Sequence, residues 1–160
     1  MKNFNKCNHF PFPCAFPIPE PPTRAFTETS SFAANTGGPE IDVIIGGTIV
    51  PLPDFQNLSG GITVNDDDTI FTVPNTGRYY INYQVNFTAS IIMGARLLIN
   101  GSPNTPSTVI PVVGLSQITN TSIVNLNAGD TVSLQLFGFA LLTILLPGST
   151  GATLTIIQIS

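Results

Sequence analysis

Residues 79–88 have the sequence YYINYQVNFT. The odd positions carry tyrosine, isoleucine, tyrosine, valine and phenylalanine, whereas four of the five even positions carry asparagine, glutamine or threonine. Because successive side chains of a β-strand point to opposite faces of the sheet, this strict period of two predicts a strand with one buried face. Residues 131–137 repeat the pattern, and there Val132, Leu134 and Leu136 are predicted to point inward.

Weaker stretches with strand character follow one another from residue 26 onward. They are residues 26–33, 43–50, 70–73, 95–99, 107–113, 116–126 and 152–159. Turn-forming residues lie between strands, at 75–77, 100–101, 127–130 and 147–148. No stretch has a convincing helical period. About eight to ten short strands in a chain of this size predict an all-β sandwich, most commonly a jelly roll.

The composition limits the class of protein. Hydrophobic residues make up 42% of the 160 residues and charged residues only 9%, whereas soluble domains average roughly 25% charged residues. The abundance of isoleucine, valine, leucine and phenylalanine excludes a disordered chain. The longest apolar run, residues 137–146, is too short for a transmembrane helix. We therefore expect one soluble globular domain, with no membrane partner.

The few charges are unevenly distributed. Beyond Asp68 the only charged residues are Arg78, Arg96 and Asp130. One interpretation is a well-solvated neutral monomer. The favoured interpretation is that other copies of the chain cover part of this uncharged half, because charge normally keeps β-proteins apart. A net charge of −4 with only five basic residues argues against nucleic acid as a partner.

Residues 1–25 are predicted to form a leader arm separate from a domain of residues 26–160. Proline occurs at six positions of this segment and favours an extended, polyproline-like backbone. Five phenylalanines, at positions 4, 10, 12, 16 and 26, suggest that the arm docks against something, although a disordered tail is the alternative. The prolines also interrupt the apolar region that a secretory signal needs, so we expect no export by the usual route.

Two motifs resemble those of the complement-head and tumour-necrosis-factor jelly rolls. In residues 71–83, FTVPNTGRYYINY, a proline-containing turn is followed by a Gly-x-Tyr sequence that opens the next strand. The glycine permits the tight turn, and the tyrosine enters the core. Residues 126–134, LNAGDTVSL, resemble the turn into a late strand of the same superfamily.

Three further stretches resemble bacterial spore-surface proteins: GGITV at 60–64, LLING at 97–101 and ATLTIIQIS at 152–160. They are similar to the C-terminal domain of the collagen-like exosporium glycoprotein BclA and to the short basal-layer proteins of the exosporium. The similarity covers about residues 26–160, and the chain has no Gly-x-y repeat for a collagen-like stalk. The resemblance implies a homotrimer of the spore exosporium, made in the mother-cell cytoplasm, whose partners are itself and other exosporium proteins.

The resemblance also suggests which residues form the trimer contact. In this superfamily strands pack around a threefold axis, and two apolar strands are candidates for that position. The predicted interface residues are Val132, Leu134, Leu136, Leu154, Ile157 and Ile159. The alternative function is a receptor- or glycan-binding head, such as a phage-fibre tip or a lectin-like module.

The sequence offers little material for catalysis or cofactor binding. His9, in the leader, is the single histidine, so we expect no catalytic triad, no enzymatic activity and no cofactor. Cys7, His9 and Cys14 could bind a metal ion, but they supply only three ligands, whereas a structural zinc site usually has four. The two cysteines are reduced thiols, close a small loop within the chain, or form cross-links between chains in a durable coat, of which the last is the favoured functional interpretation. Asp66, Asp67 and Asp68 are a weak candidate for calcium, and a solvated turn is the simpler interpretation.

Overall fold

The computed structural model describes residues 27–111, 114–139 and 141–160. The predicted leader of residues 1–25, with Cys7, His9 and Cys14, lies outside the described residues. The domain consists of thirteen strands and one short 3-10 turn among these residues. In chain order they are β1 (Ser30–Asn35), β2 (Glu40–Val43), β3 (Thr48–Ile49), β4 (Asp54–Leu58), β5 (Thr63–Val64), β6 (Phe71–Thr72), β7 (Gly77–Ile91), β8 (Met93–Ile99), β9 (Ser102–Pro103), η1 (Thr105–Ser107), β10 (Leu115–Leu126), β11 (Thr131–Gly138), β12 (Leu141–Ile144) and β13 (Ala152–Gln158).

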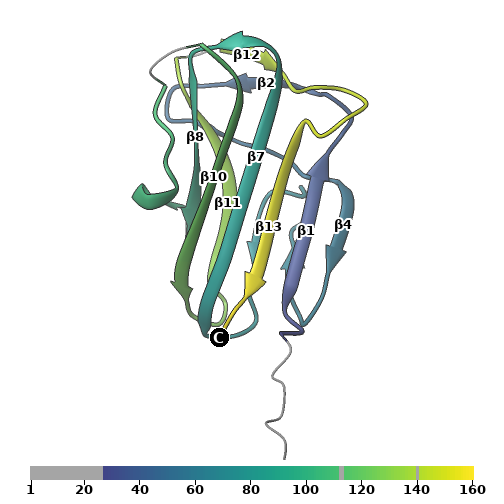
Figure 1. Ribbon diagram of the computed structural model, residues 1–160, viewed down its shortest axis with the longest axis vertical. Coiled ribbons are helices and arrows are strands. Elements are labelled where there is room, and N and C mark those ends of the chain that lie inside the picture. Colours follow the sequence, from purple (N-terminus) through teal and green to yellow (C-terminus); the bar gives the residue numbers. More distant parts are fainter. Residues whose placement is uncertain (1–26, 112–113, 140) are drawn as a thin grey trace, which may run out of the picture.

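Two antiparallel sheets lie face to face, as Figure 1 shows. The five-stranded sheet has the order β10-β7-β13-β1-β4, and the six-stranded sheet has the order β5-β6-β11-β8-β9, with β3 also paired to β11. A small sheet of β2 and β12 lies at the end of the sandwich away from the C-terminus (Figure 1). The all-β sandwich prediction is confirmed.

The two best-patterned stretches form the centre of the two sheets. β7 contains residues 79–88 and pairs with β10 on one side and β13 on the other. β11 contains residues 131–137 and pairs with β8 from Val132 to Gly138. Their inward side chains, among them Tyr79, Tyr83, Leu134 and Leu136, have no accessible surface. The alternation in the sequence therefore marks the core correctly.

Two predicted strands are wrong. Residues 43–50 are not one strand but contain the end of β2, a turn closed by the hydrogen bond from the Gly47 N–H to the Ile44 carbonyl, and β3. Residues 107–113 contribute only an isolated bridge between Val109 and Ala95 within the described part, and the 3-10 turn precedes it. The Asn104 side chain accepts the Ser107 N–H and holds this turn. Pro111 has no N–H to donate to a neighbouring strand, which opposes a continuous ladder.

The Tyr83 hydroxyl is the main polar group in the core. It lies 2.7 Å from the Ser107 carbonyl oxygen and 3.0 Å from that of Ala95, to which it can donate. The Ala95 carbonyl oxygen also accepts a hydrogen bond from the Val109 N–H. For the Ser107 carbonyl oxygen, the Tyr83 hydroxyl is the one donor among the described residues. Burial raises the pKa of Tyr83, so the hydroxyl stays protonated and remains a donor. It joins β7 to the irregular segment after β9.

Tyr83→Phe is therefore expected to lower the free energy of unfolding by about 1–3 kcal/mol, because a buried carbonyl loses its donor. Urea unfolding followed by circular dichroism measures this. Tyr80→Phe, on the opposite face of the same strand, is the matched control and should change stability by less than about 0.5 kcal/mol. An unchanged midpoint for Tyr83→Phe would show that the Ser107 carbonyl has another donor.

Asp130 holds together the two turns at the C-terminal end of the sandwich. Its carboxylate accepts the Asn127 N–H at 2.7 Å and the Asn100 side-chain amide at 2.9 Å. The Asn100 side-chain oxygen in turn accepts the Thr131 N–H at 2.8 Å. Asn100 and Gly101 have φ values of 51° and 75°, as a two-residue hairpin turn requires. The predicted Asn-Gly and Asn-Ala-Gly-Asp turns are thus confirmed and lie side by side.

Asp130→Asn should make the free energy of unfolding depend less on pH in the acidic range. Hydrogen bonds from the Asn127 backbone and the Asn100 side chain lower the pKa of Asp130 below its ordinary value of 3.8. A lowered carboxyl pKa stabilises the folded state above pH 3.8, and this contribution disappears as the pH falls through the folded-state pKa. The parent should be more stable than the variant at pH 7, and the difference should shrink at about pH 2.5. Unfolding in urea at both pH values tests this, with Asp67→Asn, on an exposed loop, as the control.

Candidate assembly surface

The outward face of the five-stranded sheet presents a row of large apolar side chains. The register places Ile123 of β10 and Ile157 of β13 on either side of Tyr80 of β7. Tyr80 and Ile157 are half-buried, and Ile123 is 54% exposed. The apolar row, as we call these three residues, crosses the three strands near the C-terminal end of the sandwich, on the face opposite the core.

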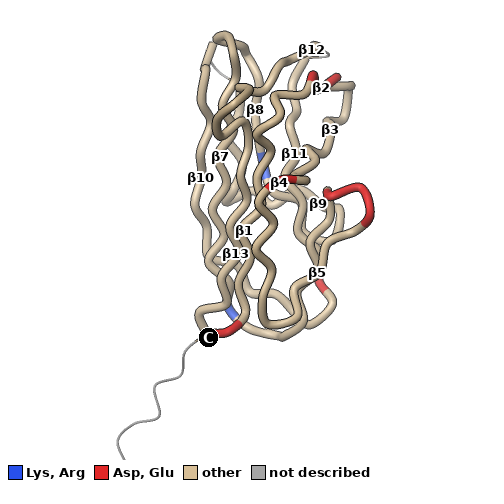
Figure 2. The backbone as a smooth tube through the Cα atoms, turned by 90° about the vertical axis from the view of Figure 1, so that its right-hand side faces the viewer, with Lys and Arg blue, Asp and Glu red and all other residues tan. Residues whose placement is uncertain are grey.

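Around the apolar row the face is polar, and Arg78, two residues before Tyr80 on the same face, is its one charged side chain on β7, β10 and β13. From Tyr80 to Thr88, β7 alternates its core residues with asparagine, glutamine and threonine, and the outward positions of β13 and β10 carry threonine and glutamine. Figure 2 shows these strands free of acidic and basic residues along most of their length, with charges at their lower end. Arg78, at the start of β7, is the charged residue nearest to the row along the strand.

The amide side chains that β7 presents on this face are already hydrogen-bonded within the chain. Asn82 donates to the Asn120 carbonyl at 3.2 Å and to the Thr121 hydroxyl at 2.8 Å. Asn86 donates to the Thr150 carbonyl at 2.6 Å. A polar group that already has a partner can be covered at little desolvation cost. The face is therefore suited to burial against another protein surface.

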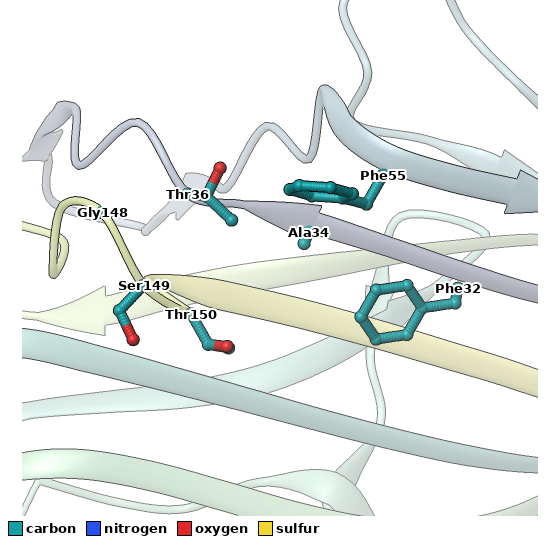
Figure 3. A pocket seen from close by; sticks show the side chains of 7 residues that line it. All are labelled: Phe32, Ala34, Thr36, Phe55, Gly148, Ser149 and Thr150. Atoms are coloured by element: carbon teal, nitrogen blue, oxygen red, sulfur yellow. The ribbon is translucent and has the colours of Figure 1, made fainter.

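An open groove of about 480 Å³ lies on the β1–β4 side of the same face (Figure 3). Phe32 and Phe55 flank its floor at Ala34, and the loop 148–150 closes one end. A register shift between Phe32 and Ala34 bulges the β1–β4 pairing, and Phe55 adopts a φ of 49° there. A positive φ is uncommon for a bulky residue. As a result Phe55 remains 73% exposed and Phe32 39% exposed.

Asp54 places a negative charge beside this groove. Its carboxylate accepts both the N–H and the hydroxyl of Thr36, at 2.7 and 2.8 Å. The backbone and side-chain hydrogen bonds from Thr36 hold the pKa of Asp54 below its ordinary value, so the group is ionised at neutral pH. The groove is therefore lined by two aromatic rings and lies next to a fixed anion, which is hydrogen-bonded to the lining residue Thr36.

The predicted interface residues lie in two different places. Val132, Leu134, Leu136 and Leu154 have no accessible surface in the single chain and point into the sandwich. A side chain with no exposed area has none to lose on association, so assigning these four to a trimer contact was wrong. Ile157 belongs to the apolar row, and Ile159, 45% exposed, lies just beyond the end of β13.

Sequence reasoning missed three exposed side chains on this face: Ile123, Phe32 and Phe55. Ile123 could have been found from the sequence, because it is an apolar residue at an outward position of β10, where the neighbouring outward positions are polar. Phe55 could not, because its orientation depends on a bulge that no local sequence signal predicts.

The aspartates at 66–68 do not form a metal site with other described residues, among which no group of three or more potential metal ligands occurs. The side chain of Asn65 organises the loop instead, by accepting the N–H groups of Thr69 and Ile70, both at 2.8 Å. Asp68 accepts a hydrogen bond from Gln56 at 2.7 Å. The calcium candidate is therefore replaced by a hydrogen-bonded turn.

A second apolar surface lies at the β2–β12 end of the sandwich. Its exposed side chains are aliphatic or aromatic and come from several loops and from β12: Ile44, Ile45, Ile92, Ile110, Phe139, Leu142 and Ile144. In the part of the chain that the structure describes, no helix has the length and apolarity to cross a membrane.

Comparison with solved structures shows the fold to be that of the tumour necrosis factors and complement heads. Eiger TNF from S. frugiperda superposes with a TM-score of 0.58 at 13% identity, over 84% of this chain and 94% of the other. The globular domain of zebrafish complement 1qA gives a TM-score of 0.56 at 13% identity, over 83% and 98%. Rabbit GITRL gives 0.53 at 13% identity, over 82% and 94%. At these identities the likeness concerns the fold alone.

Comparison of sequences identifies the family. No curated protein matches the chain significantly. The model of the BclA C-terminal domain, however, matches residues 31–160, which include every strand from the second residue of β1 to β13. This domain is associated with the spore exosporium surface. The chain therefore belongs to the BclA C-terminal domain family.

Proposed function

We propose that this chain is a structural protein of the bacterial spore exosporium that forms a homotrimer through the outward face of strands β10, β7 and β13, and that this contact leaves the groove on the β1–β4 side of the sheet free. Family membership supports the spore surface as its location. The tumour-necrosis-factor and complement-head fold supports packing around a threefold axis, which closes the assembly at a fixed size.

The observation that carries this proposal is the apolar row together with the face around it, on which Arg78 is the one charged side chain of β7, β10 and β13. Ile123, Tyr80 and Ile157 are partly exposed in the single chain, whereas the amide of Asn82 beside them already has hydrogen-bond partners. Contiguous apolar surface rimmed by satisfied polar groups is typical of a protein interface. Covering each large apolar side chain contributes about 1.5–3 kcal/mol at most, so a few such residues per contact can sustain a trimer.

The N-terminal arm gives the proposal its second part. A trimer that has buried this face needs another contact to join a layer, and residues 1–26 contain five phenylalanines and two cysteines. In this proposal the arm attaches each trimer to neighbouring trimers, and Cys7 and Cys14 form disulfides between chains. Synthesis in the mother-cell cytoplasm is part of the same proposal.

The test is to locate the protein in spores. An antibody against the domain should label the outer surface of intact spores and should follow the exosporium fraction when that layer is sheared off. Labelling confined to the spore core, to the culture medium or to phage particles would contradict the proposal. The last two locations would favour a receptor- or glycan-binding head.

A further inference from the structure

We propose that the groove between Phe32 and Phe55 is the docking site for the N-terminal arm, residues 1–26, of another copy of the chain. This inference rests on the proposed role of the arm in attachment and names the surface that receives it. Three properties of the chain support it: charge, side-chain chemistry and the direction of the backbone.

The arm and the domain have opposite formal charges. Residues 1–26 contain three basic residues, Lys2, Lys6 and Arg24, and one acid, Glu20, which gives +2. Residues 27–160 contain two basic and eight acidic residues, which gives −6. One of those acids, Asp54, lies next to Phe55, and hydrogen bonds from Thr36 keep it in place. The basic arm of one copy is therefore attracted to the acidic domain of another copy, and Asp54 places one of these negative charges beside the groove.

The side chains of the arm suit the shape of the groove. Proline-rich segments commonly bind open grooves lined by aromatic residues, because the extended backbone is already formed and loses little entropy. Here Phe32 and Phe55 form the two sides and Ala34 leaves room between them (Figure 3). Phenylalanines 10, 12 and 16 alternate with prolines 11, 13 and 17, so an aromatic ring and a proline ring can enter together.

The backbone direction favours a neighbour rather than the same chain. The Thr29 carbonyl accepts the Gln158 N–H, and the Glu28 carbonyl accepts the Ser59 hydroxyl, so the chain continues the line of β1 down to residue 28. The groove lies toward the other end of β1, at Ala34 and Thr36. The start of β1 thus points the arm away from its own groove. An extended segment of 26 residues can span up to about 80 Å, enough to reach another molecule.

Photo-crosslinking of the full-length chain tests this directly. The probe is Phe55→p-benzoylphenylalanine, which keeps an aromatic ring in the groove. After assembly of equal amounts of ¹⁵N-labelled and unlabelled chains, mass spectrometry should find position 55 linked to residues 1–26, in peptides of mixed isotope composition. Cross-links to residues 27–160 of a second copy would overturn the inference and make the groove part of the contact between domains. Cross-links within one chain, or none, would overturn it as well.

A pair of substitutions provides the functional arm of the test. Phe55→Ser should weaken association beyond the trimer by about 10- to 100-fold, as expected for a lost buried phenylalanine, and leave the trimer intact. Asn57→Ser, an exposed outward residue of the same strand, is the matched control and should assemble normally. Normal higher assembly of Phe55→Ser would contradict the inference. A chain that is monomeric before any substitution would contradict the proposed trimer instead, so the two failures are distinguishable.

Discussion

Ile157→Asp is expected to separate the trimer into folded monomers. The residue lies in the apolar row, beside Tyr80, and its side chain points away from the core. An unpaired carboxylate buried in a contact costs about 3–5 kcal/mol, which corresponds to an increase of at least two orders of magnitude in the dissociation constant. Sedimentation velocity at micromolar concentration should show the monomer, and circular dichroism should show an unchanged β-sheet spectrum.

Two further variants control this result. Thr63→Asp places the same charge on an exposed outward position of β5 in the six-stranded sheet and should leave the trimer intact. Leu134→Asp places it in the core, where the side chain has no accessible surface, and should unfold the domain. If Ile157→Asp remained trimeric, the outward face of β10, β7 and β13 would not be the contact. If it unfolded like Leu134→Asp, Ile157 would belong to the core.

Deletion of residues 1–24 is expected to have the second large effect. The truncated chain keeps every described strand, so it should fold and form trimers, but it should not build larger particles. Linking several weak contacts strengthens an assembly by about 10²- to 10⁴-fold, and removal of the arm should cost a factor in this range. Electron microscopy and sedimentation of particles larger than the trimer measure the loss. Larger particles formed equally well without the arm would show that it is only a tail.

Replacement of both cysteines should have a different result from deletion of the arm. Cys7→Ser combined with Cys14→Ser removes the proposed disulfides but keeps the phenylalanines and prolines of the arm. We expect assembly to proceed and the product to become sensitive to heat and detergent. Gel electrophoresis without reducing agent, after heating, distinguishes the variant from the parent. Equal resistance of the two proteins would argue that the cysteines are reduced thiols.

The sequence predicted the parts of the fold in which one face of a strand is buried. β7 and β11 were predicted because alternation is imposed by the core itself, and the Asn-Gly and Gly-Asp turns because they need particular backbone angles. β4, with the sequence DFQNL, was missed because it lies at an edge and bulges, so its pattern is irregular. β12 was missed because it lies within an apolar run that has no period.

The assembly surface was predictable only in part. Alternation shows that Val132, Leu134 and Leu136 are buried, but it does not show whether the covering surface belongs to the same chain or to another. The structure shows that the same chain covers them. Ile157 was distinguishable because it directly follows Ile156, so the two side chains point to opposite faces of β13 and a single core can cover only one of them. The groove at Phe55 required the three-dimensional pairing of β1 with β4.

Sedimentation equilibrium of the intact chain in reducing buffer tests the central claim most directly. The smallest stable species at micromolar concentration should have three times the chain mass of 16.9 kDa, and Ile157→Asp should convert it to a folded species of one chain mass. A parent protein that stays at 16.9 kDa over this concentration range would contradict the proposed trimer. Its apolar row would then be free in solution.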